Sequence, residues 1–209
     1  MEKEITITWP RRRPYSNVLQ FKITLLETDP PVWRRIQVPE YYTCYDLHVA
    51  IQDAMGWEDR HLHDFKIQPR RRACIGIRIE CPFALEDLED EAPLMTTEVT
   101  IMDFLQEPGD RVLYTYDYGD GWLHDVLFEG SYPKEPGKKY PNCLAGELAG
   151  PPEDCGGIQG YYDCVKALKN RDNSEGKLTW LGRWRPDRFD PAKIKFWSPL
   201  RRLKIALKD

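Results

Sequence analysis

The chain has 209 residues, a formal net charge of −4, 41% hydrophobic residues and 31% charged residues. This composition is typical of a soluble globular protein with a substantial core, and the weakly acidic balance gives no overall field that would attract nucleic acid. No run of about 18 apolar residues is present, which excludes a membrane-spanning helix. The first residues, Met-Glu-Lys-Glu, lack an apolar signal core, so we expect a cytoplasmic protein without a membrane partner.

Residues 1–16 are predicted to form an N-terminal arm with one candidate strand at residues 5–8. Residues 19–25 alternate between apolar and polar side chains, which predicts a strand. After the turn Asp29-Pro30-Pro31, residues 32–38 are expected to pair with it in antiparallel fashion.

A helix is predicted next, because Thr43 and Asp46 have the spacing of a capping box. Gly56 is expected to end this helix, and the apolar residues between them recur at a spacing of three and four, which predicts one buried face. Those residues are Leu47, Ala50, Ile51, Ala54 and Met55.

Short strands are predicted at residues 63–67 and 74–79, joined by the basic stretch Arg70-Arg71-Arg72. The acidic run of residues 86–91 is expected to be a loop, and a helical turn is expected to start at Thr97 or Thr100 and reach Leu105. The later elements are a hairpin of residues 111–118 and 122–129, a mostly irregular stretch of residues 131–160, and three helices. These helices are residues 159–168, one that begins at Asp190-Pro191, and residues 200–207 after Ser198-Pro199.

The predicted order of elements is a strand pair, a helix, further strands and finally helices. This order predicts an α+β fold with a mainly antiparallel sheet covered by helices. No repeat or soft linker divides the chain, so we expect a single domain at residues 17–207. The six cysteines include no Cys-x-x-Cys pair, and in a cytosolic protein they are expected to be free thiols or metal ligands.

The hairpin around Gly119-Asp120-Gly121 is the strongest candidate site, because aromatic, acidic and histidine side chains crowd both arms. A two-residue Asp120-Gly121 turn would place Asp117 opposite His124 and Tyr116 opposite Asp125. A three-residue loop would instead place Tyr116 opposite His124, and both registers remain open.

We expect this hairpin, the strand that begins at His63 and the loop of residues 143–161 to gather at one groove. Trp122 and Tyr118 would offer apolar contacts there, and Asp117 and His124 would offer polar contacts. The candidate binding residues are Tyr116, Asp117, Tyr118, Asp120, Trp122, His124, His63 and Asp64.

A zinc site is a second interpretation, because His63, His124, Cys143 and Cys155 carry the nitrogen and sulfur ligands that zinc prefers. Their spacing matches no recognised zinc finger, and histidines that end strands with buried cysteines would explain the same residues. No cofactor is otherwise expected, since the phosphate-binding glycine motifs are missing.

Nine motifs in fixed order resemble the plasmid Ri open-reading-frame-three-like family, also labelled insertion-element passenger TnpR-like proteins. The resemblance covers about residues 18–195 and implies a single α+β domain with no established activity. The chain departs from the family at Gly150, where relatives carry a further Cys, so a metal site using that Cys would be replaced or lost here. The motifs are residues 24–35, 46–48, 54–57, 61–65, 116–124, 143–146, 151–157, 160–161 and 189–191.

The function favoured by these patterns is a cytosolic binding or interaction module, linked to mobile genetic elements through the resemblance, with a protein partner as one option. A metal-dependent hydrolase that uses His63, His124 and nearby Asp is one alternative. A nucleic-acid accessory protein is another, because the basic ends and exposed aromatic residues offer phosphate and base contacts. The sequence leaves open whether the protein is an enzyme.

Overall fold

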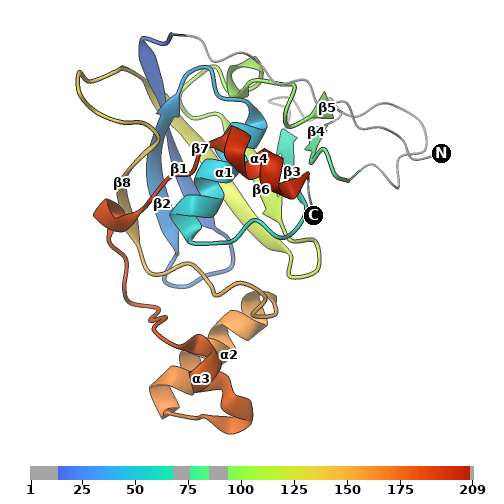
Figure 1. Ribbon diagram of the computed structural model, residues 1–209, viewed down its shortest axis with the longest axis vertical. Coiled ribbons are helices and arrows are strands. Elements are labelled where there is room, and N and C mark those ends of the chain that lie inside the picture. The colour runs from blue at the N-terminus through green and yellow to red at the C-terminus, as the bar shows by residue number, and fades with distance from the viewer. Residues whose placement is uncertain (1–13, 68–75, 85–93, 208–209) are drawn as a thin grey trace, which may run out of the picture.

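The computed structural model describes residues 14–67, 76–84 and 94–207. Among them, eight strands form one sheet in the order β5-β4-β3-β6-β7-β1-β2-β8 (Figure 1). Neighbouring strands are antiparallel except β4 and β5. The prediction of an α+β fold with a mainly antiparallel sheet is confirmed. The candidate strand at residues 5–8 and the charged stretches 70–72 and 86–91 lie outside the described residues.

The helices form two groups. Helices α1 and α4 cross the sheet next to each other, whereas α2 and α3 lie together at one end, away from them (Figure 1). In the described part of the chain, no helix is both long and apolar enough to cross a bilayer. The strands are β1 Asn17–Leu25, β2 Trp33–Pro39, β3 His63–Ile67, β4 Ile77–Glu80, β5 Leu94–Met95, β6 Arg111–Tyr116, β7 Trp122–Pro133 and β8 Asn142–Glu147. The helices are α1 Cys44–Met55, α2 Gly157–Asn170, α3 Lys177–Leu181 and α4 Pro199–Ala206, with 3-10 turns η2 Ile101–Asp103, η3 Ser174–Gly176 and η4 Pro191–Lys193.

Strand β1 is an interior strand, because both of its edges are paired, with β2 on one side and β7 on the other. Its alternating apolar residues point into the core, where Phe21 and Ile23 are fully buried. The Phe21 ring packs against Phe128 of β7 with ring centroids 5.5 Å apart. The alternation read from the sequence therefore marks an interior strand of the sheet.

Helix α1 begins at the predicted capping box. The Thr43 hydroxyl accepts a hydrogen bond from the backbone N–H of Asp46 at 3.1 Å, and the Thr43 N–H donates to the Asp46 carboxylate at 3.0 Å. Gly56 ends the helix in the left-handed conformation, with φ 89°. Every residue of α1 is buried, because the sheet covers one side and α4 contacts another.

Both predicted registers of the β6–β7 hairpin are wrong. Tyr116 pairs with Trp122 and Tyr114 pairs with His124, so five residues form the loop. Asp117 leaves the strand in the left-handed conformation, with φ 55°, and its Oδ1 accepts hydrogen bonds from the backbone N–H groups of Gly119 and Asp120. This Asx-type turn lengthens the loop and removes the expected Asp117–His124 pair.

Other strands and helices differ from their predicted bounds where the local sequence pattern is weak. The described part of the strand predicted at residues 74–79 is β4, Ile77–Glu80, and the stretch of residues 131–160 contains strand β8. Strand β8 has little apolar alternation, and it forms because it completes the edge of β2. The helix expected after Asp190 is only the 3-10 turn η4, which Asp190 caps through the N–H of Ala192. The predicted helices near α2 and α4 are present.

A buried arginine connects the sheet to its surroundings. The Nε of Arg34 donates to the carbonyl oxygen of Ala54 at 2.8 Å, and its NH1 donates to the carbonyls of Trp33 at 2.7 Å and Glu147 at 3.0 Å. Its guanidinium carbon lies 3.8 Å from the ring centroid of Phe189. Burial lowers the pKa of Arg34 to about 10, so the group stays charged at neutral pH.

We predict that Arg34→Met lowers the free energy of unfolding by about 3 kcal/mol or more, because three carbonyls lose the donor that a buried, charged guanidinium supplies. Urea unfolding at pH 7 measures this loss. The matched control is Arg35→Met, whose guanidinium makes a partly exposed pair with Glu129 and which should lose less than about 1 kcal/mol. Equal losses in the two variants would contradict this account.

Candidate functional site

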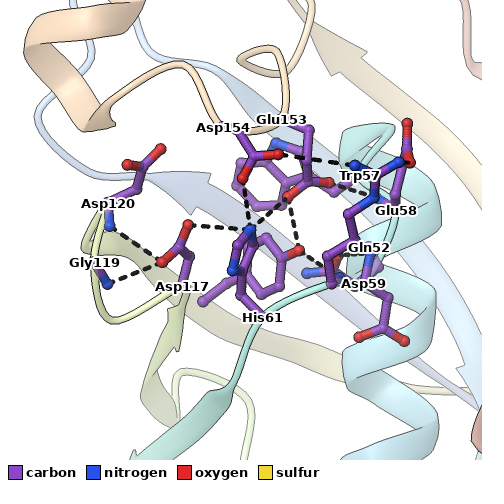
Figure 2. A network of polar contacts seen from close by, with 12 residues as sticks. Gln52, Trp57, Glu58, Asp59, His61, Asp117, Gly119, Asp120, Glu153 and Asp154 are labelled. Carbon is purple, nitrogen blue, oxygen red and sulfur yellow. Dashed lines mark hydrogen bonds and ion pairs between the residues drawn. The ribbon is translucent and has the colours of Figure 1, made fainter. Parts of the chain in front are cut away.

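Three connecting segments meet at one end of the sheet (Figure 2). They are residues 56–62 between α1 and β3, residues 117–121 between β6 and β7, and residues 148–156 between β8 and α2. The indole Nε1 of Trp57 donates to the carbonyl oxygen of Pro151 at 3.0 Å and joins the first segment to the third.

Two glycines let these segments touch. A Cβ at Gly150 would lie 2.1 Å from the carbonyl oxygen of Met55, and a Cβ at Gly157 would lie 2.6 Å from the carbonyl oxygen of Asp120. The N–H of Gly156 also donates to the Asp120 carboxylate at 3.1 Å. The 148–156 segment is therefore held against both neighbours by direct backbone contact.

The imidazole of His61 lies at the centre of this junction. Its Nε2 lies 2.7 Å from Asp154 Oδ1, 3.5 Å from Asp117 Oδ2 and 3.9 Å from Glu153 Oε1. The side chains of Asp117 and Glu153 are only 11% and 12% exposed. Three carboxylates thus converge on one ring nitrogen, two of them at largely buried positions.

Tyr116 fixes the position of Glu153. Its hydroxyl donates to Glu153 Oε1 at 2.8 Å and accepts from the backbone N–H of Arg60 at 3.0 Å. Its ring stacks on Trp57 with centroids 5.0 Å apart. Burial, followed by the hydrogen bond to Glu153, raises the pKa of Tyr116 above its usual value, so the hydroxyl remains a donor.

Negative groups outnumber positive groups in this cluster. Arg60 pairs with Glu58 and lies 3.9 Å from Asp154, while the single Nε2 of His61 can donate only one proton. The carboxylates of the junction are therefore left with less positive charge than they carry negative charge. The carboxylates of the junction belong to Asp117, Glu153 and Asp154, which lie near His61, and to Glu58 and Asp120, which contact Arg60 and the N–H of Gly156.

This geometry suits a metal ion. Ligand atoms about 2.0–2.2 Å from a zinc ion lie roughly 3–3.5 Å from one another, and the ligand atoms of His61, Glu153 and Asp154 all lie within 4.8 Å of one another. Asp117 Oδ2 is near the same nitrogen. One nitrogen and up to three oxygens are thus within reach of a shared ion after small side-chain rotations.

A second group of potential ligands is buried behind the first. His48 lies between the Tyr114 hydroxyl, 2.7 Å from Nδ1, and Asp59 Oδ1, 2.6 Å from Nε2. Its ring stacks on His63 with centroids 3.4 Å apart and an interplanar angle of 9°. A histidine nitrogen binds a metal ion that lies in the plane of its ring. Because the rings of His48 and His63 are stacked and parallel, an ion in the plane of one ring lies outside the plane of the other. The pair therefore suits hydrogen bonding better than the binding of one shared metal ion.

The predicted site residues are divided between the surface and the core. Tyr116, Asp117 and Asp120 join the cluster around His61. Trp122 and His124 are sealed in the core, with 1% and 0% of their surface exposed, so the ligand contacts expected from them are not supported.

The other predicted binding residues lie along β3 and the hairpin loop. Asp64 and Tyr118 belong to a separate polar group, in which Arg78 lies 2.5 Å from Asp64 Oδ2 and 3.3 Å from the Tyr118 hydroxyl. His63 is buried beside His48.

The predicted zinc ligands are not brought together. In the described part of the chain, neither of the two groups of three or more potential ligands contains His124, Cys143 or Cys155. The thiols of Cys143 and Cys155 instead approach the backbone carbonyls of Ala145 and Gly157. The cysteines that the structure describes are free thiols.

The core histidine His124 has an unusual environment. Both ring nitrogens are buried without a hydrogen-bond partner among the described residues. The rings of Trp57 and Tyr114 lie 5.3 Å and 5.2 Å away. Burial lowers the pKa of His124 from 6.5 to about 3, so the ring is neutral at pH 7.

We predict that acid destabilises the protein through His124. Below pH 6.5 the unfolded chain binds a proton that the folded chain excludes, so stability present above pH 6.5 is lost as the pH falls toward 3. At pH 4.5 the loss from this residue is about 2–3 kcal/mol. Chemical unfolding of wild type and His124→Leu at pH 7 and 4.5 measures it, and identical pH dependence in both proteins would refute it.

Together, the sheet and the cluster define a mainly antiparallel α+β protein with an imidazole and several carboxylates at a junction of three loops. The family model for plasmid pRiA4b ORF-3-like protein matches residues 17–194, and the chain belongs to this family. It is 32% identical over 185 residues to the uncharacterized protein y4hQ of Sinorhizobium fredii, which covers 87% of this chain and 88% of that protein.

A solved structure has the same fold. The chain is similar to the protein of unknown function MM3350 from Methanosarcina mazei Go1, with a TM-score of 0.76 and 36% identity over 88% of this chain and 100% of that one. The resemblance noted in the sequence motifs is therefore confirmed. Neither relative carries a functional name, so the function has to be argued from the site.

Proposed function

We propose that the protein is a binding module that takes one divalent metal ion between His61, Asp117, Glu153 and Asp154. The observation that carries this proposal is the convergence of three carboxylates on Nε2 of His61. A divalent cation would replace the missing positive charge and draw the four ligands together.

The ligand chemistry favours Zn²⁺ or Mn²⁺. Imidazole is a good ligand for zinc and other transition metals, whereas carboxylates also suit manganese. Tyr116 holds Glu153, and two backbone N–H groups hold Oδ1 of Asp117 so that its Oδ2 faces His61. Such outer contacts orient metal ligands before the ion arrives.

This proposal differs from the alternatives read from the sequence. A hydrolase built on His63 and His124 is disfavoured because both rings are buried, and the acidic cluster would repel nucleic-acid phosphates. A protein partner, a cytoplasmic location and a link with mobile elements stay predictions that rest on the sequence and the resemblance.

Metal titration of untagged, chelator-treated protein tests the proposal. Calorimetry with Zn²⁺ and electron paramagnetic resonance with Mn²⁺ should each report one site per chain. His61→Gln and Glu153→Gln should weaken binding at least about tenfold, since each removes a ligand. Asp163→Asn, at an exposed position of α2, is the matched control and should bind as wild type does.

Two outcomes would overturn the metal site. One is the lack of saturable binding of either ion, and the other is unchanged affinity in both ligand variants. Circular dichroism of each variant separates lost ligands from lost folding, and Asp154→Asn, at a 52% exposed side chain, gives a further ligand variant with little risk to the fold.

A further inference from the structure

The segment that connects α3 to α4, residues 182–198, differs in charge from the rest of the chain, and we call it the strap. In Figure 1 it leaves α3 at the lower end of the molecule, runs beside β8 through η4 and reaches α4. The strap and α4 together carry eight Lys and Arg residues and only two Asp residues, although the whole chain has a net charge of −4. They therefore form a basic strip on a weakly acidic protein.

Four apolar side chains attach the strap to the fold by packing against the main core. The indole Nε1 of Trp184 also donates to the carbonyl oxygen of Gly150 at 2.8 Å. The ring of Phe189 covers the guanidinium of Arg34. The strap is thus held at several points along its length, and the exposed side chains between these points keep a fixed order on the surface. The four attached residues are Trp184, Phe189, Ile194 and Phe196.

Most of the exposed cations in this strip lack an acidic partner. In the described part of the chain, the pairs that the strip forms with carboxylates are Lys193 with Asp190 and Arg202 with Asp53 and Asp59. The unpaired cations repel one another, and a bound polyanion would relieve this repulsion. The exposed cations without a carboxylate partner among the described residues are Arg183, Arg185, Arg188, Lys195, Arg201 and Lys204.

Exposed indole rings lie at both ends of the strap. Trp180 of α3 is 52% exposed and Trp197 is 44% exposed, whereas the other tryptophans that the structure describes are buried or half-buried. The guanidinium carbons of Arg201 and Arg202 lie 5.0 Å and 5.5 Å from the ring centroid of Trp197. The row of cations on the strap is therefore flanked by two rings that are open to stacking.

Cations in a row with exposed aromatic rings are the features by which proteins bind single-stranded nucleic acid. The cations follow the phosphates, and the rings stack on the bases. A duplex offers the same phosphates, but its bases are already stacked on one another. The two indoles therefore favour a single strand over a duplex.

A lipid surface fits the strip less well. Anionic lipids would attract the cations, and Leu200 and Ile205 of α4 are exposed apolar side chains. However, four of the six unpaired cations lie on the strap, where the apolar side chains beside them face the core. Membrane binding requires cations and exposed apolar side chains on the same surface.

We propose that the strap binds a single-stranded polynucleotide, with the phosphates along its cations and bases stacked on Trp180 and Trp197. This surface shares no residue with the proposed metal site and goes beyond it. It also differs from the acidic cluster around His61, which would repel phosphates.

Fluorescence anisotropy of labelled oligo(dT) and oligo(U), each about 20 nucleotides long, tests this proposal. The full chain is titrated with a chelator present, so that no metal contributes. We expect saturable binding at about 50 mM salt, with a slope of log affinity against log salt of about −3 to −4, because about four to six phosphates are contacted. A dA·dT duplex of equal length should bind at least about threefold more weakly, and the tighter of the two oligonucleotides identifies DNA or RNA as the ligand.

Substitution of two strap cations tests the phosphate contacts. The double variant Arg188→Gln and Lys195→Gln should weaken binding and make the salt slope shallower by about 1 to 1.5, because two phosphate contacts are lost. Lys139→Gln removes a charge at an exposed position of the loop between β7 and β8. This control should bind as wild type does.

Substitution of the two indoles tests the base contacts separately. Trp180→Ala and Trp197→Ala should each weaken oligo(dT) binding at least about fivefold and leave the salt slope unchanged, because stacking releases no counterions. Tyr132→Ala, at a 42% exposed aromatic side chain of β7, is the matched control and should bind as wild type does. Circular dichroism confirms that each variant is folded.

Several results would overturn the proposal. They are no saturable binding of either oligonucleotide at low salt, tighter binding of the duplex, and unchanged affinity in the cation variant or in both tryptophan variants. Equally tight binding of polyglutamate would show a surface for any polyanion. Equally tight binding of vesicles of phosphatidylserine and phosphatidylcholine would show a lipid surface, and either result would exclude specific recognition of a polynucleotide.

Discussion

The guanidinium of Arg34 fixes the distance between the sheet and two chain segments that leave it. Its acceptors include the carbonyl of Ala54, in the last turn of α1, and the carbonyl of Glu147, at the end of β8. The segments that follow carry His61 and Glu153 to their meeting point. One buried cation, held by carbonyls and an aromatic ring, thus sets the starting points of the loops that form the polar cluster.

Elements with a local cause were predictable from the sequence. The capping box of Thr43 and Asp46 involves residues three apart, and the alternation in β1 repeats every second residue, so both signals lie within one element. The hairpin register was not predictable in this way, because Asp117 leaves the strand to cap its own loop. Strand β8 forms mainly because it completes the edge of β2, which leaves little mark on its own sequence.

Only part of the cluster around His61 was predictable, because its residues come from segments far apart in the sequence. The sequence singled out the hairpin that supplies Asp117 but not the bond between His61 and Asp154, which are 93 positions apart. The two motifs that carry them were each visible, yet no spacing rule connects them. Residue type also misled at His124, since a histidine in a polar-looking motif carries no sign that its ring is sealed beneath Trp57.

The close approaches at Gly150 and Gly157 restrict which residues this chain can carry at these two positions. At these positions the loop backbone lies against the carbonyls of Met55 and Asp120, with no space for a side chain. The path of the loop is therefore set by main-chain contacts rather than by the side chains between the glycines. The side chains between the glycines can be replaced, and the ligand chemistry of the junction changed with them, without disturbing the main-chain contacts that set the path of the loop.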